Sequence, residues 1–185
     1  MDESILKEWA SQALGALPYP DPRFPPSPYY RFLKILAMNL KPGLSVELGV
    51  CGGGGSFYLA TGFVNGTVVG VDIADDHREN IDFVLGRCHN FRFWVGDSIK
   101  AAPRVYQEYG QVGILFIDTV HTYSRTLAEY RAWEPYLAEG AAVCFDDLLR
   151  PEMVGFWEDL PGNKLRLDQL HDGAESGGGF GVLWF

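Results

Sequence analysis

The segment SVELGVCGGGGS, residues 45–56, constrains the fold more than any other part of the chain. Its apolar start is typical of the end of a buried strand, and the glycine-rich run 49–55 predicts a turn where a ligand can lie against bare backbone. The next residues, SFYLATGF, predict a helix whose free N–H groups point back into that turn. Together these features predict a nucleotide-type site, and the alternative is a turn that binds no ligand.

The spacing of these glycines favours one kind of cofactor. A dinucleotide-binding turn needs glycines at i, i+2 and i+5, and no register of this segment supplies all three. Instead, Glu47 stands two residues before Gly49, and Gly53 and Gly55 follow. A carboxylate there repels a pyrophosphate but can pair with an ammonium, such as the methionine end of S-adenosylmethionine. The turn therefore predicts S-adenosylmethionine rather than NAD.

From residue 44 onward, apolar strands alternate with amphipathic helices, which is typical of a parallel sheet covered on both faces. The sequence predicts strands at 44–48, 67–72, 91–98, 112–118 and 141–147, and helices at 55–63, 75–86 and 99–109. Each of these strands has an acid within its last two residues. Because the carboxyl ends of parallel strands line the ligand crevice, we expect a row of carboxylates along one rim of the sheet.

Two positions on this rim suit an adenosine group. Asp72 stands where an acid accepts hydrogen bonds from both ribose hydroxyls, although it could instead cap the helix expected at 75–86. Asp97 and Ser98 are placed to meet the amino edge of adenine. Gly-Asp-Ser is also an ordinary N-cap for the helix at 99–109, and the two roles can coexist.

Three acids and one histidine follow two strands that we expect to be neighbours. Asp118 ends one strand, and Asp146 and Asp147 end the next. Adjacent parallel strands lie about 4.8 Å apart, so the three carboxylates can converge, and they suit Mg²⁺, Mn²⁺ or Ca²⁺ better than zinc, with Mg²⁺ the first candidate. His121 would face the same site as the candidate proton acceptor, with Asp118 the second, although a lone histidine is more often structural.

The run FIDTVHTYSRTLAEYRAWEPYLAEGAAVCFDDL, residues 116–148, resembles the signature of class I S-adenosylmethionine-dependent methyltransferases. It is most similar to the metal-dependent small-molecule O-methyltransferases that modify macrolide and other natural-product sugars. The segments VELGVCGGGG, VVGVDI and GDS resemble the cofactor motifs of that branch. The resemblance covers roughly residues 44–150 and implies a Rossmann-like α/β fold. Its sheet has seven mostly parallel strands, helices on both faces and an antiparallel strand near one edge.

The resemblance also implies a role for each candidate residue. The residues that match the cradle for methionine and ribose are Glu47, Gly49, Gly53 and Gly55. Those that match the ribose and adenine contacts are Asp72, Asp97 and Ser98. Those that match the metal ligands and the base are Asp118, Asp146, Asp147 and His121. The chain departs from the pattern in its Gly140-Ala141 pair, in its four successive glycines and in its short N-terminal region.

The 185 residues suit a single domain. Residues 1–43 are expected to form a cap, with helices at 3–16 and 30–40 joined by the proline and aromatic segment PYPDPRFPPSPYY. That segment is either a strap over the core or a lid over a substrate pocket. Residues 44–185 are expected to form the cofactor-binding domain. It would end in a covering helix at PEMVGFWEDLPG and an antiparallel hairpin.

Composition limits the classes of molecule that the protein is expected to bind. With 15 basic and 24 acidic side chains the net charge is −9, which disfavours nucleic acid as a partner. The N-terminus lacks an apolar signal region, no stretch reaches membrane-spanning length, and the three cysteines have no metal-like spacing, so we expect a cytoplasmic protein with reduced thiols. The short N-terminal region means that any lid is small or comes from another subunit, which leaves a homo-oligomer open.

The sequence therefore predicts an S-adenosylmethionine-dependent O-methyltransferase that acts on a hydroxyl of a small molecule with the help of a divalent metal. Two alternatives stay open at this point. One is a non-catalytic S-adenosylmethionine-binding module. The other is an NAD-dependent oxidoreductase, which the glycine spacing disfavours.

Overall fold

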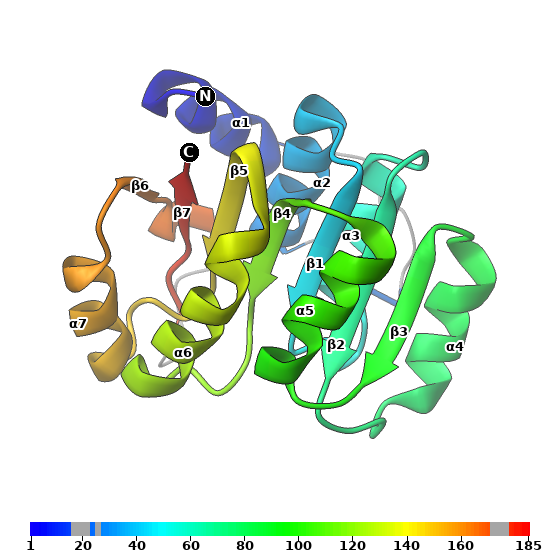
Figure 1. Cartoon of the computed structure of the whole chain (residues 1–185). Helices are drawn as coiled ribbons and strands as arrows, with labels where there is room; N and C mark the ends of the chain where they lie inside the picture. Colours follow the sequence, from blue (N-terminus) through cyan, green and yellow to red (C-terminus); the bar gives the residue numbers. More distant parts are fainter. Residues whose placement is uncertain (16–22, 25–26, 171–177) are drawn as a thin grey trace.

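The computed structural model describes residues 1–15, 23–24, 27–170 and 178–185. Seven strands form one sheet: β1 (Leu44–Leu48), β2 (Thr67–Asp72), β3 (Phe91–Val95), β4 (Val112–Ile117), β5 (Leu137–Phe145), β6 (Asn163–Arg166) and β7 (Gly181–Trp184). Their order is β3-β2-β1-β4-β5-β7-β6 (Figure 1). The first five strands pair in parallel, and β7 is antiparallel to both of its neighbours. This confirms the predicted fold class and the antiparallel strand near one edge.

The helices are α1 (Glu3–Leu14), α2 (Pro28–Leu40), α3 (Gly54–Gly62), α4 (Arg78–Arg87), α5 (Ser98–Tyr109), α6 (Tyr123–Trp133) and α7 (Pro151–Asp159), with short 3₁₀ turns η1 (Glu134–Tyr136) and η2 (Asp168–Leu170). They cover both faces of the sheet. One face packs against α1 to α4, and the other packs against α5, α6 and α7. In Figure 1, α5 and α6 lie in front of the sheet.

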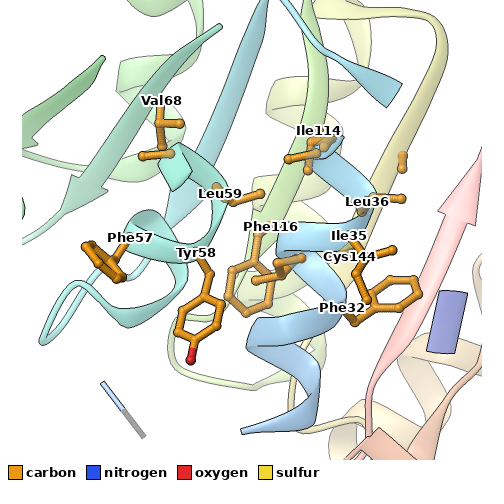
Figure 2. Close-up of a cluster of buried hydrophobic side chains, with 14 of the residues drawn as sticks. Phe32, Ile35, Leu36, Phe57, Tyr58, Leu59, Val68, Ile114, Phe116 and Cys144 are labelled. Carbon is orange, nitrogen blue, oxygen red and sulfur yellow. The ribbon is translucent and has the colours of Figure 1, made fainter. Parts of the chain in front are cut away.

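The alternation of side chains along each strand supplies both cores. In β4, Ile114 and Phe116 face the first helix layer, whereas Leu115 and Ile117 face the second. Figure 2 shows Phe116 among side chains of α2 and α3 in the first core. All four side chains are almost completely buried. Such a strand reads as a continuous apolar run, which is why its position could be predicted from sequence.

Several element boundaries differ from the predicted ones. The helix after β2 starts at Arg78 rather than at 75, because the preceding loop is held by Asp72, which accepts the N–H of Ala74 over 3.3 Å. Strand β5 starts at Leu137, four residues early, and its register against β4 shifts between Val112 and Ile114. The first strand of the expected C-terminal hairpin is short: β6 ends at Arg166, and the 3₁₀ turn η2 follows it.

Parts of two expected features lie outside the described residues. The proline and aromatic segment falls largely on residues 16–22 and 25–26, and the connection before β7 falls on residues 171–177. The strands on either side of that connection, β6 and β7, do pair antiparallel, as the hairpin prediction requires. Within the described part of the chain, no helix has the length and apolar character needed to cross a membrane.

Candidate functional site

The turn after β1 is fixed against the end of β4. Gly49 has a left-handed φ of 86° and donates its N–H to the carbonyl of Val71 over 2.9 Å. A Cβ atom on Gly49 would lie 2.0 Å from the carbonyl oxygen of Asp118. Only glycine satisfies both conditions. The predicted cofactor turn and the first of the predicted metal ligands are therefore held side by side.

The later glycines of the turn serve contacts within the protein. Gly53, with φ 84°, precedes the first turn of α3. A Cβ atom on Gly54 would lie 2.7 Å from the ring of Tyr30, and one on Gly55 would lie 2.1 Å from Oε1 of Glu47. The run of four glycines thus lets α3 start tightly against two side chains that sit beneath it.

Glu47 is buried below the turn. Its carboxyl group accepts a hydrogen bond from the hydroxyl of Ser56, and the side chain is 1% exposed. Burial raises the pKa of Glu47 to about 8, against the opposing effect of the Ser56 hydrogen bond. The carboxyl group is therefore largely protonated near pH 7. Its predicted contact with a cofactor ammonium stays a prediction, and that contact would require Glu47 to lose its proton.

A cavity of about 500 Å³ lies at the carboxyl edge of the sheet. The turn after β1, the segments after β2 and β4, the start of α5 and one side of α6 form its wall. The predicted site residues that line it are Gly49, Asp72, Asp97, Ser98 and Asp118. The other predicted site residues are not part of this lining: Glu47, Gly53, Gly55, His121, Asp146 and Asp147. The row of acids predicted for this rim is thus partly assembled around one cavity.

Asp72 joins two loops of the cavity wall. Its Oδ2 accepts the N–H of Cys51 over 2.8 Å, and its Oδ1 accepts the N–H of Ala74 over 3.3 Å. A carboxylate has about four acceptor positions, so two remain available for a ligand. The expected capping of the next helix is not observed, because α4 begins six residues later without a side-chain cap.

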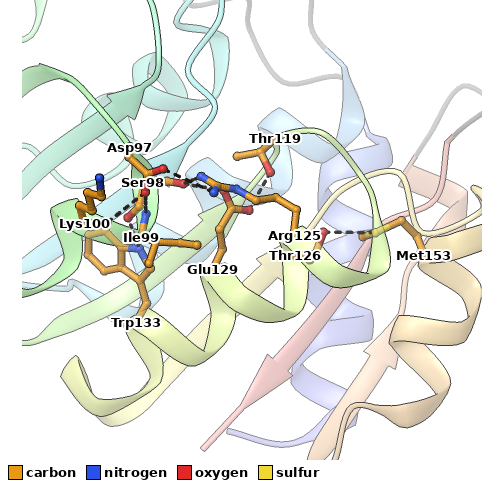
Figure 3. Close-up of polar contacts among 10 residues, drawn as sticks. All are labelled: Asp97, Ser98, Ile99, Lys100, Thr119, Arg125, Thr126, Glu129, Trp133 and Met153. Carbon is orange, nitrogen blue, oxygen red and sulfur yellow. Dashed lines mark hydrogen bonds and ion pairs between the residues drawn. The ribbon is translucent and has the colours of Figure 1, made fainter.

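Asp97 and Ser98 start helix α5 and meet two residues that the sequence reasoning missed. Asp97 accepts the N–H groups of Ile99 and Lys100, so the predicted N-cap is present. Figure 3 shows that Arg125 and Glu129 of α6 complete this corner of the cavity. Their spacing of four residues just after β4 was the available signal, because such a pair shares one side of a helix.

The predicted metal ligands and His121 gather at the ends of β4 and β5. His121 Nε2 lies 3.5 Å from Asp118 Oδ1 and 3.4 Å from Asp147 Oδ2. Asp118 also shares a side-chain hydrogen bond with Asp146. Arg150 donates from Nε to Asp147 Oδ2 over 2.6 Å. The four predicted residues are thus brought together, but within the described residues no group of three acids, histidines or cysteines has the geometry of a metal site.

Electrostatics and backbone geometry mark the same place. Burial, together with the charges of Asp146, Glu47 and Asp147, raises the pKa of Asp118 well above its usual range. Burial lowers the pKa of His121, although Asp147 and Asp146 act in the opposite direction. His121 and Asp147 also adopt left-handed φ values of 50° and 56°. Such strained positions concentrate at functional sites.

Two tyrosines at the start of α2 stand near these acids. The rings of Tyr29 and Tyr30 lie 4.3 Å apart, and their hydroxyl groups share a hydrogen bond. Burial and the charges of Asp146 and Asp118 raise the pKa of Tyr29. The sequence placed both rings in a strap or a lid without assigning them a partner.

The raised pKa of Glu47 predicts a pH-dependent stability that Glu47→Gln removes. The folded protein keeps a proton that the unfolded chain releases near pH 4.5, so this contribution is complete below pH 4.5 and is lost as the pH rises through about 8. At about 1.4 kcal/mol per pH unit, the wild type should lose about 4 kcal/mol more than Glu47→Gln between pH 5 and pH 9. Urea unfolding of both proteins at the two pH values measures this difference, and equal losses would contradict it.

Comparison with known proteins places this geometry in a family. A family model described as a methyltransferase domain matches residues 46–148, more than half of the chain. A search of curated proteins gave no match.

Solved structures with the same fold cover nearly the whole chain. An O-methyltransferase from Bacillus cereus in complex with SAH is 19% identical, with a TM-score of 0.69 over 98% of this chain and 90% of that one. The O-methyltransferase TomG from Streptomyces achromogenes, in complex with SAM, is 19% identical, with a TM-score of 0.66 over 98% and 89%. Cofactor-bound Rv0187 from MTB is 18% identical, with a TM-score of 0.68 over 97% and 87%. This chain belongs to the methyltransferase domain family and has the Rossmann-like fold of class I methyltransferases.

Proposed function

We propose that this protein transfers the methyl group of S-adenosylmethionine to a hydroxyl oxygen of a small molecule. The observation that carries the proposal is the cavity that runs from Asp97 past Asp72 to Gly49 and Asp118. Its lining offers Asp72 and Asp97 as acceptor groups for an adenosine and includes Asp118, which lies 3.5 Å from His121. Two of the solved structures with this fold are described as O-methyltransferases with SAH or SAM bound, which supports the same cofactor and the same kind of acceptor here.

The cavity suits a cofactor that combines a neutral nucleoside with a cationic centre. Asp72 keeps two acceptor positions for ribose hydroxyls, and Asp97 lies farther along the same wall. The acids in the lining outnumber its bases, which favours a sulfonium and an ammonium over a pyrophosphate. Gly49 and Cys51, from the glycine-rich turn, also line this cavity. The same features disfavour NAD, whose pyrophosphate would lie against carboxylates.

The chemical step needs positioning and one proton acceptor. Bound S-adenosylmethionine supplies a methyl group on a positively charged sulfur. Transfer to the acceptor oxygen would break the carbon–sulfur bond with its electron pair left on sulfur, and the protein would have to take up the hydroxyl proton. His121 is the proposed acceptor of that proton, because its lowered pKa keeps the imidazole neutral near pH 7 and it lies between Asp118 and Asp147. Asp118, whose pKa is raised, is the second candidate.

We also propose a divalent cation, most simply Mg²⁺, held by Asp118, Asp146 and Asp147. The donor chemistry fits a hard cation, because buried carboxylates stand close enough to raise the pKa of Asp118. Arg150 contacts Oδ2 of Asp147 over 2.6 Å, so a cation would be bound by the other oxygen of Asp147 or would displace this ion pair. A bound cation would supply Lewis-acid chemistry that makes the acceptor hydroxyl more acidic.

The remaining features of the proposal concern partners and organisation. A hydroxylated small molecule is the proposed acceptor, and the net charge of −9 favours neither nucleic acid nor an anionic membrane surface. Residues 1–43 would cap the site, since Tyr29 and Tyr30 of α2 already reach its acids, and residues 44–185 would form the cofactor-binding domain. A cytoplasmic location and a homo-oligomer that completes the cap belong to the same proposal.

Calorimetric titration tests the cofactor. S-adenosylhomocysteine should bind in the micromolar range and NAD should not, and Asp72→Asn should weaken S-adenosylhomocysteine binding about 10- to 100-fold because a charged acceptor for the ribose is lost. Asp82→Asn is the matched control, since this exposed acid of α4 pairs with Arg78 at the surface, away from the cavity. Binding of NAD alone would make the proposed function wrong.

The role of His121 is tested by His121→Asn, because asparagine tolerates the left-handed backbone at this position. Across a panel of hydroxylated metabolites, kcat for the production of S-adenosylhomocysteine should fall about 100-fold or more. Affinity for S-adenosylhomocysteine should be unchanged. His89→Asn, at an exposed position after α4, is the control. A variant at His121 that keeps more than half of the wild-type kcat would contradict the assignment.

Removal of divalent ions tests the metal separately. After treatment with EDTA, turnover should fall about 100-fold and return when Mg²⁺ is added, because the acceptor hydroxyl then regains the acidity that the cation supplies. Affinity for S-adenosylhomocysteine should change little. Undiminished turnover in EDTA would make the metal proposal wrong and leave methyl transfer standing.

A further inference from the structure

A buried carboxylate joins three segments of the cavity wall. Glu129 is 0% exposed and accepts hydrogen bonds from Ser98 Oγ over 2.5 Å, Thr119 Oγ1 over 2.7 Å and Arg125 Nε over 2.9 Å. These donors come from the start of α5, the segment after β4 and α6 itself (Figure 3). A buried charge is costly unless it is paired and hydrogen-bonded, and here three donors compensate it.

Arg125 is held from three sides. Besides the bond to Glu129, Nη2 donates to Ser98 Oγ over 2.6 Å, and Nη1 lies 3.5 Å from Asp97 Oδ2. A guanidinium has five N–H groups, so two remain for a ligand. The side chain is one-third exposed and lines the cavity, where it is the only basic residue among the described lining residues. Its orientation is therefore fixed before any ligand binds.

The charge of this corner selects the kind of group that it can bind. Asp97 and Glu129 each carry a negative charge and Arg125 a positive one, so the corner has a net charge of −1. A phosphate or carboxylate is disfavoured there. A neutral ring with a donor beside an acceptor is favoured, because Asp97 Oδ1 already accepts two backbone N–H groups while Oδ2 can accept another donor. Adenine carries this pair, with an amino donor next to a ring nitrogen acceptor.

We propose that Arg125 is a specificity-determining residue for the adenine ring, and that Glu129 is the positioning residue that aims it. One free N–H of the guanidinium donates to a ring nitrogen of adenine, while Asp97 accepts from the neighbouring amino group. The inference rests on the proposed function, since it assumes an adenosyl cofactor. It adds to that function a pair of adenine contacts, Asp97 at the start of α5 and Arg125 on α6. The buried Glu129 holds the two helices together through Ser98 and Arg125.

A cycle of protein and ligand changes isolates this hydrogen bond. The ligands are S-adenosylhomocysteine and its two analogues in which carbon replaces ring nitrogen N1 or N7. In the wild type, one analogue should bind about 10-fold more weakly than the parent compound, which is the worth of one hydrogen bond to a charged donor. Calorimetry of the wild type and of Arg125→Met and Arg125→Lys with each ligand gives the ratios.

Both variants should bind S-adenosylhomocysteine about 10-fold more weakly. They should no longer distinguish it from the analogue that the wild type binds weakly, so the ratio of the two dissociation constants falls from about 10 to about 1. Arg125→Lys keeps the charge that compensates Glu129, so it remains informative where Arg125→Met fails to fold. Glu129→Gln should lower the ratio in the same direction, because the guanidinium loses its charged partner. Arg131→Lys, on the same helix and paired with Glu134 at the surface, should keep the wild-type ratio.

A merely structural role for Arg125 would weaken all three ligands equally. An unchanged ratio in Arg125→Lys, or a wild type that binds both analogues as tightly as the parent compound, overturns the inference while the proposed function stands. A wild type that binds no S-adenosylhomocysteine overturns the proposed function and this inference together.

Discussion

The close approach of two backbones, at Gly49 and Asp118, is the constraint on which the rest of the site depends. Neighbouring parallel strands β1 and β4 end together, and the missing side chain of Gly49 lets the turn after β1 pass against the carbonyl of Asp118. Gly49 and Asp118 both line the cavity, and the side chain of Asp118 also lies 3.5 Å from His121. A side chain at Gly49 would push the turn away from Asp118. The relative position of the turn and of Asp118 is thus fixed by backbone geometry before any ligand binds.

The strands and their acidic ends could be predicted from sequence because both depend on local pattern. A strand buried on both faces must be apolar throughout, and the first polar residue after it marks its end. Asp118 and Asp146 directly follow β4 and β5, and their convergence follows from the parallel pairing of those strands. The pairing of β4 with β5 was inferred from the fold class alone. The strands and the positions of their terminal acids could therefore be predicted, because one strong apolar pattern determines both.

The parts that sequence reasoning missed depend on contacts between distant segments. The contact of Glu47 with a cofactor stays a prediction, but its spacing did not show that the side chain is buried at the start of α3 and accepts a hydrogen bond from Ser56. The sequence analysis assigned no role to Arg125 and Glu129, which stand four residues apart on one helix. Only the packing of α6 against α5 shows that Glu129 is buried against Ser98. Spacing gives the side of a helix on which a residue lies, but it does not say what covers that side.

The protein compensates the negative charge of this rim in a different way at each point. Glu129 and Asp147 have arginine partners, whereas Glu47 and Asp118 have raised pKa values and so favour the protonated form. An arginine holds a carboxylate in place by an ion pair and hydrogen bonds, which suits a rigid recognition corner. A proton leaves when a cation arrives, so the acids near the turn can ionise as a positively charged group binds. Arginine pairing and protonation therefore occur together around His121, where Asp147 pairs with Arg150 and Asp118 has a raised pKa, whereas the corner at Glu129 is compensated by Arg125.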